Sequence, residues 1–93
     1  MKFIGEGRLL PSIKDLEREG DYCLRYSDDE IAALWMILPR TKTRGRIPAI
    51  GHGHGKPEWS IWLEDGTATV SPSIDEGNGG YHGCLQNGVW SDG

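Results

Sequence analysis

The amino-acid sequence predicts a mostly β fold: a small antiparallel sheet, sandwich-like or barrel-like, with one short N-terminal helix that puts it at the margin of the α+β class. Short segments of alternating or β-branched apolar residues recur along the chain, and glycine-containing turns separate them. Only one segment has strong helical signals. The 93 residues contain no repeat and no linker, so we expect a single domain spanning residues 1–93.

The helix is expected near residues 12–19, within "SIKDLEREG". Ser12 is a suitable N-cap, Ile13 and Leu16 lie three residues apart, and Gly20 is a typical stop.

A strand is expected next, because "DYCLRY" alternates Tyr22, Leu24 and Tyr26 against other residues in a half-buried pattern. The following segment, 27–39, begins with a capping-box pattern and continues as the apolar run "LWMIL". We expect a turn of helix there and then a strand. "RGRIPAIG" is the expected return strand, and the basic loop before it is the hairpin tip.

The second half of the chain predicts two hairpins. In the first, strands at Trp59–Leu63 and Thr67–Val70 flank an Asp-Gly turn. In the second, "YHGCLQNGVW" contains a strand, an Asn-Gly turn and a short return. Alternation along the Trp59 strand places Trp59, Ile61 and Leu63 on the core face, and Trp62 on the other face as an exposed interface anchor.

The composition is that of a soluble globular protein, with 37% hydrophobic and 26% charged residues and a net charge of −4. No apolar run is long enough to span a bilayer, and the N-terminus lacks a secretory signal. We therefore expect a cytoplasmic protein without membrane contact, in which Cys23 and Cys84 stay reduced.

Residues 35–56 contain five basic residues and no acidic one, whereas residues 57–93 contain acidic residues and no Lys or Arg. In "RTKTRGR" the basic residues occupy every second position, which on an extended strand would put all four on one side. This stripe is a candidate partner-binding surface, formed by Arg40, Lys42, Arg44 and Arg46. The chain as a whole is acidic, so the simpler interpretation is a solvated hairpin tip, and nucleic acid is not the expected partner.

The segment "GHGHG", residues 51–55, contains two of the three histidines. His52 and His54 have a spacing that directs both side chains the same way in an extended segment, and His82 and Cys84 repeat it on a predicted strand. Together they are a candidate tetrahedral zinc set. The alternative is a tight surface loop that leads into the Trp59 strand, with no cofactor. We favour the loop, because ordering a glycine-rich clamp has a large entropic cost.

The order of "LWMILP", "RIPAIGHGHG", "EWSIWLEDGTATVSPSI" and "GGYHGCLQNGVW" resembles a set of short phage and bacterial proteins of unknown function. The resemblance covers roughly residues 34–90. Those proteins share a tryptophan segment, a Thr-x-Ser-Pro-Ser-Ile motif and a Cys-x-x-His strand, and some carry cysteine pairs suited to zinc. Here Gly79 stands at the position of the cysteine before His82. The resemblance implies an origin in a mobile element, but no activity.

No catalytic residue is predicted. The serine, aspartate and histidine of a hydrolase triad are all present in one segment, at Ser71, Ser73, Asp75 and His82. No nucleophile-elbow pattern surrounds them. We expect a small binding module rather than an enzyme, one that acts by contact with a host protein, for example by inhibiting a host defence or processing enzyme. The alternative is a zinc-binding protein or a metal-dependent enzyme that uses His52, His54, His82 and Cys84.

Overall fold

The computed structural model describes residues 2–92, and the fold is built almost entirely from β-strands. In chain order the elements are β1 (Lys2–Glu6), the 3-10 helix η1 (Ile13–Asp15), β2 (Tyr22–Ser27), β3 (Glu30–Ile37), β4 (Arg44–Pro48), β5 (Ser60–Glu64), β6 (Thr67–Ser71), β7 (Ile74–Asp75), β8 (His82–Gln86) and β9 (Val89–Asp92). The mostly β prediction is confirmed.

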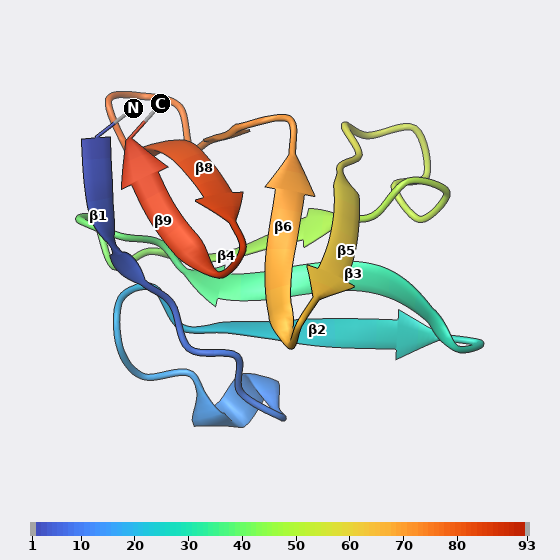
Figure 1. Ribbon diagram of the computed structural model, residues 1–93. Coiled ribbons are helices and arrows are strands. Elements are labelled where there is room, and N and C mark those ends of the chain that lie inside the picture. The colour runs from blue at the N-terminus through green and yellow to red at the C-terminus, as the bar shows by residue number, and fades with distance from the viewer. Residues whose placement is uncertain (1, 93) are drawn as a thin grey trace.

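The strands form three antiparallel sheets, with the orders β1-β9-β8-β7, β2-β3-β4 and β5-β6. Figure 1 shows β5, β6, β8, β9 and β1 running crosswise to the β2-β3-β4 sheet. The β5-β6 hairpin lies beside β8 in the same layer, and the backbone N–H of Gly88, in the β8-β9 turn, donates to the carbonyl of Ala68 at 2.8 Å. The arrangement is therefore two crossed β layers, as in orthogonal sheet packings.

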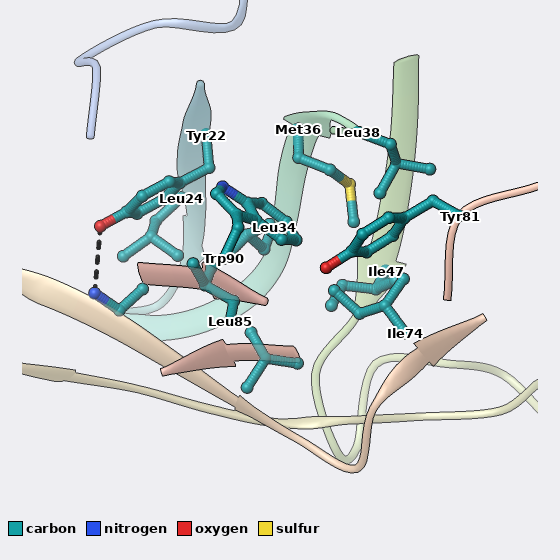
Figure 2. Packing of buried hydrophobic residues seen from close by; sticks show 12 residues of the cluster. Tyr22, Leu24, Leu34, Met36, Leu38, Ile47, Ile74, Tyr81, Leu85 and Trp90 are labelled. Atoms are coloured by element: carbon teal, nitrogen blue, oxygen red, sulfur yellow. Dashed lines mark hydrogen bonds between the residues drawn. The ribbon is translucent and has the colours of Figure 1, made fainter. Parts of the chain in front are cut away.

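The main core lies between these two layers. Sheet alternation directs one face of β2, β3 and β4 toward β6, β8 and β9 (Figure 2). The indole of Trp90 is buried there, and Tyr81 packs against it in an edge-to-face pair with ring centroids 5.8 Å apart. The buried members of the cluster are Tyr22, Leu24, Leu34, Met36, Leu38, Ile47, Ala68, Val70, Ile74, Tyr81, Leu85 and Trp90.

A second, smaller cluster covers the opposite face of the β2-β3-β4 sheet. Leu16 packs there on Cys23 and Ile37, and the partly buried Leu10, Ile13 and Trp35 complete it. The segment around η1 therefore protects the outer face of β2, which explains why both faces of that strand are buried at its start.

The helix predicted over residues 12–19 is wrong in length, because only Ile13–Asp15 form a single 3-10 turn. The side chain of Ser12 makes no capping hydrogen bond, and Leu16 is already extended. The hydrogen bonds of so short a helix do not offset the free-energy cost of nucleating it. The chain instead becomes extended at Leu16, whose side chain is buried in the second cluster.

The turn of helix predicted in segment 27–39 is also wrong. β2 and β3 are joined by a tight turn at Asp28 and Asp29, which have φ of 50° and 66°. Ser27 and Glu30 face each other across the hairpin rather than forming a capping box. Aspartate tolerates this left-handed geometry, which suits a two-residue hairpin loop.

The hairpins predicted in the second half are confirmed. β5 and β6 flank a turn at Asp65 and Gly66, and β8 and β9 flank one at Asn87 and Gly88. The return strand predicted at "RGRIPAIG" is confirmed as β4. The sequence analysis did not predict β1 or β7; β7 is only two residues long and follows the bend after Ser71.

Within residues 2–92 there is no helix with the length and apolar character that crossing a membrane requires.

Candidate functional site

A shallow cleft runs along the outer edge of β5. Its volume is about 470 Å³, and its other walls are the start of β3 and the segment that follows β4. The lining residues are Glu30, Ile31, Ala49, Ile50, His52, Trp59, Ser60, Ile61, Trp62 and Leu63. Apolar side chains from three separate parts of the chain therefore meet at one place on the surface.

Three large hydrophobic side chains are exposed at this cleft. The exposed fraction is 64% for Ile50, 39% for Trp62 and 38% for Leu63. We call these three residues, with the half-buried Ile31 and Ile61 beside them, the β5 surface. Exposed large apolar groups gathered in one patch are typical of a contact site for another molecule.

The alternation of β5 determines which way its side chains face. Trp62 lies opposite Thr69 on β6 and points away from the core, as predicted. Ile61 lies opposite Val70 and packs against the core. Leu63 was also predicted to be a core residue, and this is wrong: it lies on the core-side face but at the open cleft, where no second layer covers it.

Trp59 is half-buried rather than fully buried. It packs against the main core, and its indole N–H donates to the carbonyl oxygen of Ser73 at 3.3 Å. Its backbone joins the segment after β4, because its N–H donates to Pro48 and its carbonyl accepts from Ile50. Trp59 thus anchors the start of β5 beside the cleft.

The "GHGHG" segment is the tight loop between β4 and β5. One carboxylate oxygen of Glu58 accepts hydrogen bonds from the backbone N–H groups of Gly51, at 3.1 Å, and Gly53, at 2.6 Å. A Cβ at Gly53 would lie 2.4 Å from the Cγ of Glu58, so glycine is required there by close packing. His54 has a φ of 50°, which is not extended. The glycines therefore serve the backbone geometry of the loop.

The four candidate zinc ligands lie in two places. His52 and His54 are in this loop, and the Nε2 of His52 is 3.7 Å from a carboxylate oxygen of Glu30. His82 and Cys84 are on β8, which β5 and β6 separate from the loop (Figure 1). Within residues 2–92, no group of three or more His, Cys, Asp or Glu side chains is placed to hold a metal ion.

The basic stripe predicted on an extended strand does not form. Arg40 and Lys42 have φ of 68° and 59°, so the chain turns at both residues before β4 begins. Arg40 forms two hydrogen bonds to the carboxylate of Asp92, at 3.0 and 2.7 Å. Only Arg44 and Arg46 share a strand. The left-handed residues break the period of two that an extended strand requires, so the four basic residues do not lie along one strand.

Both arginines on β4 have contacts within the chain. Arg44 donates to the carbonyl oxygen of Leu16 at 2.8 Å, and the guanidinium of Arg46 lies 5.9 Å from the ring centroid of Trp35. The bond from Arg44 holds the N-terminal segment against β4. The guanidinium of Arg46 covers the indole of Trp35 on the outer face of the sheet.

The triad-like residue types lie close together at the start of β8. The Oγ of Ser73 is 3.3 Å from the Nε2 of His82, and Asp75 is the cross-strand partner of His82. The carboxylate of Asp75, however, accepts the backbone N–H of Gly77 at 2.8 Å. These polar residues are well explained as the surface of the β7-β8 pair.

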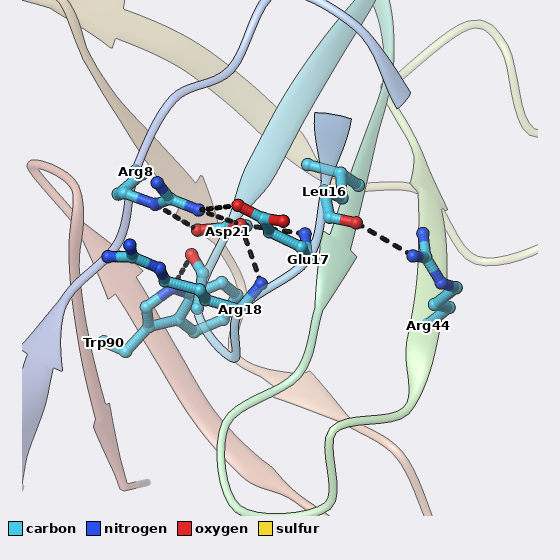
Figure 3. Close-up of polar contacts among 8 residues, drawn as sticks. Arg8, Leu16, Glu17, Arg18, Asp21, Arg44 and Trp90 are labelled. Carbon is cyan, nitrogen blue, oxygen red and sulfur yellow. Dashed lines mark hydrogen bonds and ion pairs between the residues drawn. The ribbon is translucent and has the colours of Figure 1, made fainter. Parts of the chain in front are cut away.

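Sequence reasoning missed a polar network around Asp21, a buried carboxylate just before β2 (Figure 3). Arg8 donates two hydrogen bonds to it, at 2.8 and 2.7 Å, and the backbone N–H groups of Glu17 and Arg18 donate at 3.0 and 2.9 Å. Burial raises the pKa of Asp21, but the bonds from Arg8 and the two backbone groups outweigh it, and the pKa falls to about 2. This network fixes the N-terminal segment against the sheet.

No protein-family model matches this chain, and neither the curated proteins nor the solved structures contain a match to it.

Proposed function

We propose that this protein is a small cytoplasmic binding module that acts by contact with another protein, and that the β5 surface is its contact site. The observation that carries the proposal is the gathering of Ile50, Trp62 and Leu63, all exposed, around one shallow cleft. Tryptophan contributes more than most residues to the binding energy of protein interfaces, and Trp62 points outward at the rim of this cleft.

The chemistry of the surface favours binding over catalysis. The cleft is open and mainly apolar, and its charged residue Glu30 lies beside His52. A host-cell protein is the partner class that we propose, on the basis of the resemblance of residues 34–90 to short phage and bacterial proteins and the mobile-element origin that this resemblance implies. Inhibition of a host defence or processing enzyme is the role that such contact would serve.

Affinity capture with quantitative mass spectrometry tests the proposal. The tagged protein, a Trp62→Ala variant and a Tyr26→Ala variant are each exposed to a bacterial lysate, and captured proteins are then purified and titrated. Tyr26 is the matched control, because it is also an exposed aromatic residue but lies at a separate groove on β2.

We expect Trp62→Ala to weaken partner binding by about 30-fold, which corresponds to an interface hot spot of roughly 2 kcal/mol. Tyr26→Ala should bind like the unmodified protein. A partner that binds all three proteins equally would show that the contact site lies elsewhere, and the absence of any specific partner would reject the binding function.

A further inference from the structure

A second hollow lies between the end of β4 and the loop that follows this strand (Figure 1). Its volume is about 670 Å³, within the range of roughly 300–1,000 Å³ that is usual for small-molecule sites. We call it the β4 hollow. It shares His52 and Trp59 with the cleft at the β5 surface, but none of the exposed residues Ile50, Trp62 and Leu63 lines it. The β4 hollow is therefore a separate place for a ligand.

The side chains that line the β4 hollow are polar without being acidic, or apolar. Arg46 on β4 and Lys56 in the loop are cations, and His54 in the same loop adds two ring nitrogens. Among the described residues, no Asp or Glu lines the hollow. A chain with a net charge of −4 therefore presents positive charge at this place, which favours an anionic ligand.

The acidic groups nearest to the hollow are engaged elsewhere. Glu58 accepts the backbone N–H groups of Gly51 and Gly53 within the loop. Glu30 lines the cleft at the β5 surface, and its carboxylate lies 3.7 Å from the Nε2 of His52. We therefore do not count His52 among the anion ligands.

Arg46 is positioned without the use of its hydrogen-bond donors. Its guanidinium lies over the ring of Trp35, 5.9 Å from the ring centroid. Arg40 and Arg44 donate to acceptors of this chain, but within residues 2–92 no acceptor is paired with the N–H groups of Arg46. The planar fork of an arginine matches two oxygens of a phosphate, so a positioned and unpaired Arg46 is a suitable anchor for one.

The loop that carries His54 and Lys56 is ordered by its own hydrogen bonds. The N–H of Gly53 donates to Glu58 at 2.6 Å, and the N–H of Lys56 donates to the carbonyl oxygen of Gly53 at 3.1 Å. The side chains of His54 and Lys56 are exposed, and in the described part of the chain neither has a hydrogen-bond or ion-pair partner. An ordered backbone with unpaired polar side chains lowers the entropic cost of holding a ligand.

The remaining wall of the β4 hollow is apolar. It includes Pro48, Pro57 and the half-buried Trp59. The indole N–H of Trp59 donates to Ser73, and the backbone of Trp59 is bonded to Pro48 and Ile50, so this wall is held in place. Tryptophan and proline offer rigid surfaces on which a flat organic group can pack.

We propose that the β4 hollow binds a small phosphate monoester with a flat organic group, such as a mononucleotide. The phosphate accepts hydrogen bonds from Arg46, Lys56 and His54, and the organic group lies against Trp59 and the prolines. A phosphate monoester carries about 1.5 to 2 negative charges at pH 7, more than a single carboxylate, so it suits a site with two cations. This inference goes beyond the proposed function, because the ligand is a small molecule and its phosphate site lies outside the β5 surface.

The same site does not predict binding of nucleic acid. Each phosphodiester of a nucleic-acid backbone carries one charge, and affinity for the backbone needs several phosphate contacts in succession. Arg40 is paired with Asp92 and Arg44 with Leu16, so the cations of the β4 hollow are not continued by a basic row.

NMR titration of the ¹⁵N-labelled full chain tests the proposal. Adenosine 5′-monophosphate (AMP), inorganic phosphate and adenosine are added separately at constant ionic strength. We expect AMP to shift the backbone signals of β4 and the following loop with a Kd on the order of 0.1–1 mM, because the hollow is open. Inorganic phosphate and adenosine should each bind at least about tenfold more weakly, since each lacks one half of the ligand.

Charge-removing variants test the assignment of the phosphate site. Arg46→Gln and Lys56→Gln should each weaken AMP binding at least about fivefold, whereas Lys56→Arg should retain it. Lys14→Gln is the matched control and should leave the Kd unchanged. Lys14 is exposed on η1, which packs at the start of β2, whereas the β4 hollow lies at the end of that strand. The spectrum of each unliganded variant shows whether it is folded.

The absence of saturable shifts at about 10 mM AMP, shifts centred outside the β4 hollow, or equal affinities for folded Lys56→Gln and Lys14→Gln would each overturn the proposal. Tighter binding of citrate or of a glutamate-rich peptide than of AMP would also overturn it, because the hollow would then be a carboxylate site. These measurements use the purified chain alone, so their failure is distinct from failure of partner capture.

Discussion

The backbone N–H of Ala68 donates a 3.1 Å hydrogen bond to the hydroxyl oxygen of Tyr22, and this bond joins β6 to β2 across the core (Figure 2). Both residues are buried. The bond ties the hairpin that carries the β5 surface to the second layer of the fold.

Replacing Tyr22 by Phe should lower the free energy of unfolding by about 1–3 kcal/mol, because the buried N–H of Ala68 would lose its acceptor. Urea denaturation measures this change. Tyr26→Phe is the control, since Tyr26 is exposed on the same strand and its change should be within about 0.5 kcal/mol. Equal stabilities for the two variants would show that water or a backbone shift satisfies Ala68.

Acid should destabilise the protein through Asp21. The folded-state pKa of Asp21 is about 2, below its value in the unfolded chain. The carboxylate therefore stabilises the fold fully above about pH 5, and this contribution is lost progressively as the pH falls through the folded-state pKa of about 2. At roughly 1.4 kcal/mol per pKa unit, the loss is about 2–3 kcal/mol.

Asp21→Asn should remove this part of the pH dependence and destabilise the protein at neutral pH, since Arg8 would lose its charged partner. Asp28→Asn in the exposed β2-β3 turn is the control and should keep the wild-type pH profile. Thermal unfolding between pH 2 and 7 measures both. A wild-type profile for Asp21→Asn would place the acid sensitivity in another group.

The two tryptophans of the β5 region should behave differently. Trp59→Ala should cost about 2–3 kcal/mol, somewhat less than for a fully buried tryptophan, because Trp59 is half-buried against the core. Trp62→Ala should cost less than about 1 kcal/mol, since its side chain points outward. Chemical denaturation decides this, and a large loss of stability for Trp62→Ala would mean that Trp62 has a structural role.

We predict that protein purified without a histidine tag contains no stoichiometric zinc. The histidines of the "GHGHG" loop lie apart from His82 and Cys84, and Glu58 already orders the loop. Mass spectrometric metal analysis after dialysis is the measurement. One zinc per chain, with a fall in melting temperature on chelation, would make the metalloprotein alternative the leading one.

Nucleic-acid binding should be absent at physiological salt. Arg40 is paired with Asp92, and Arg44 and Arg46 contact Leu16 and Trp35, so the basic residues do not form a continuous row. Fluorescence anisotropy with duplex and single-stranded probes checks this. Micromolar affinity that falls steeply with salt, and falls less steeply in Arg46→Ala, would contradict it.

The sequence by itself determined the features that local chemistry controls. Asp-Gly and Asn-Gly pairs adopt the left-handed geometry of two-residue hairpin turns at little cost, so β5-β6 and β8-β9 were predictable, together with the outward face of Trp62. The tertiary structure decided whatever depends on distant residues. Leu63 has the pattern of a core residue but lies at a cleft that no second layer covers, and Ser12 has the pattern of a helix cap but leads into a single turn. The buried Asp21 had no local signal, because its partner Arg8 is 13 residues away and only the folded chain brings them together.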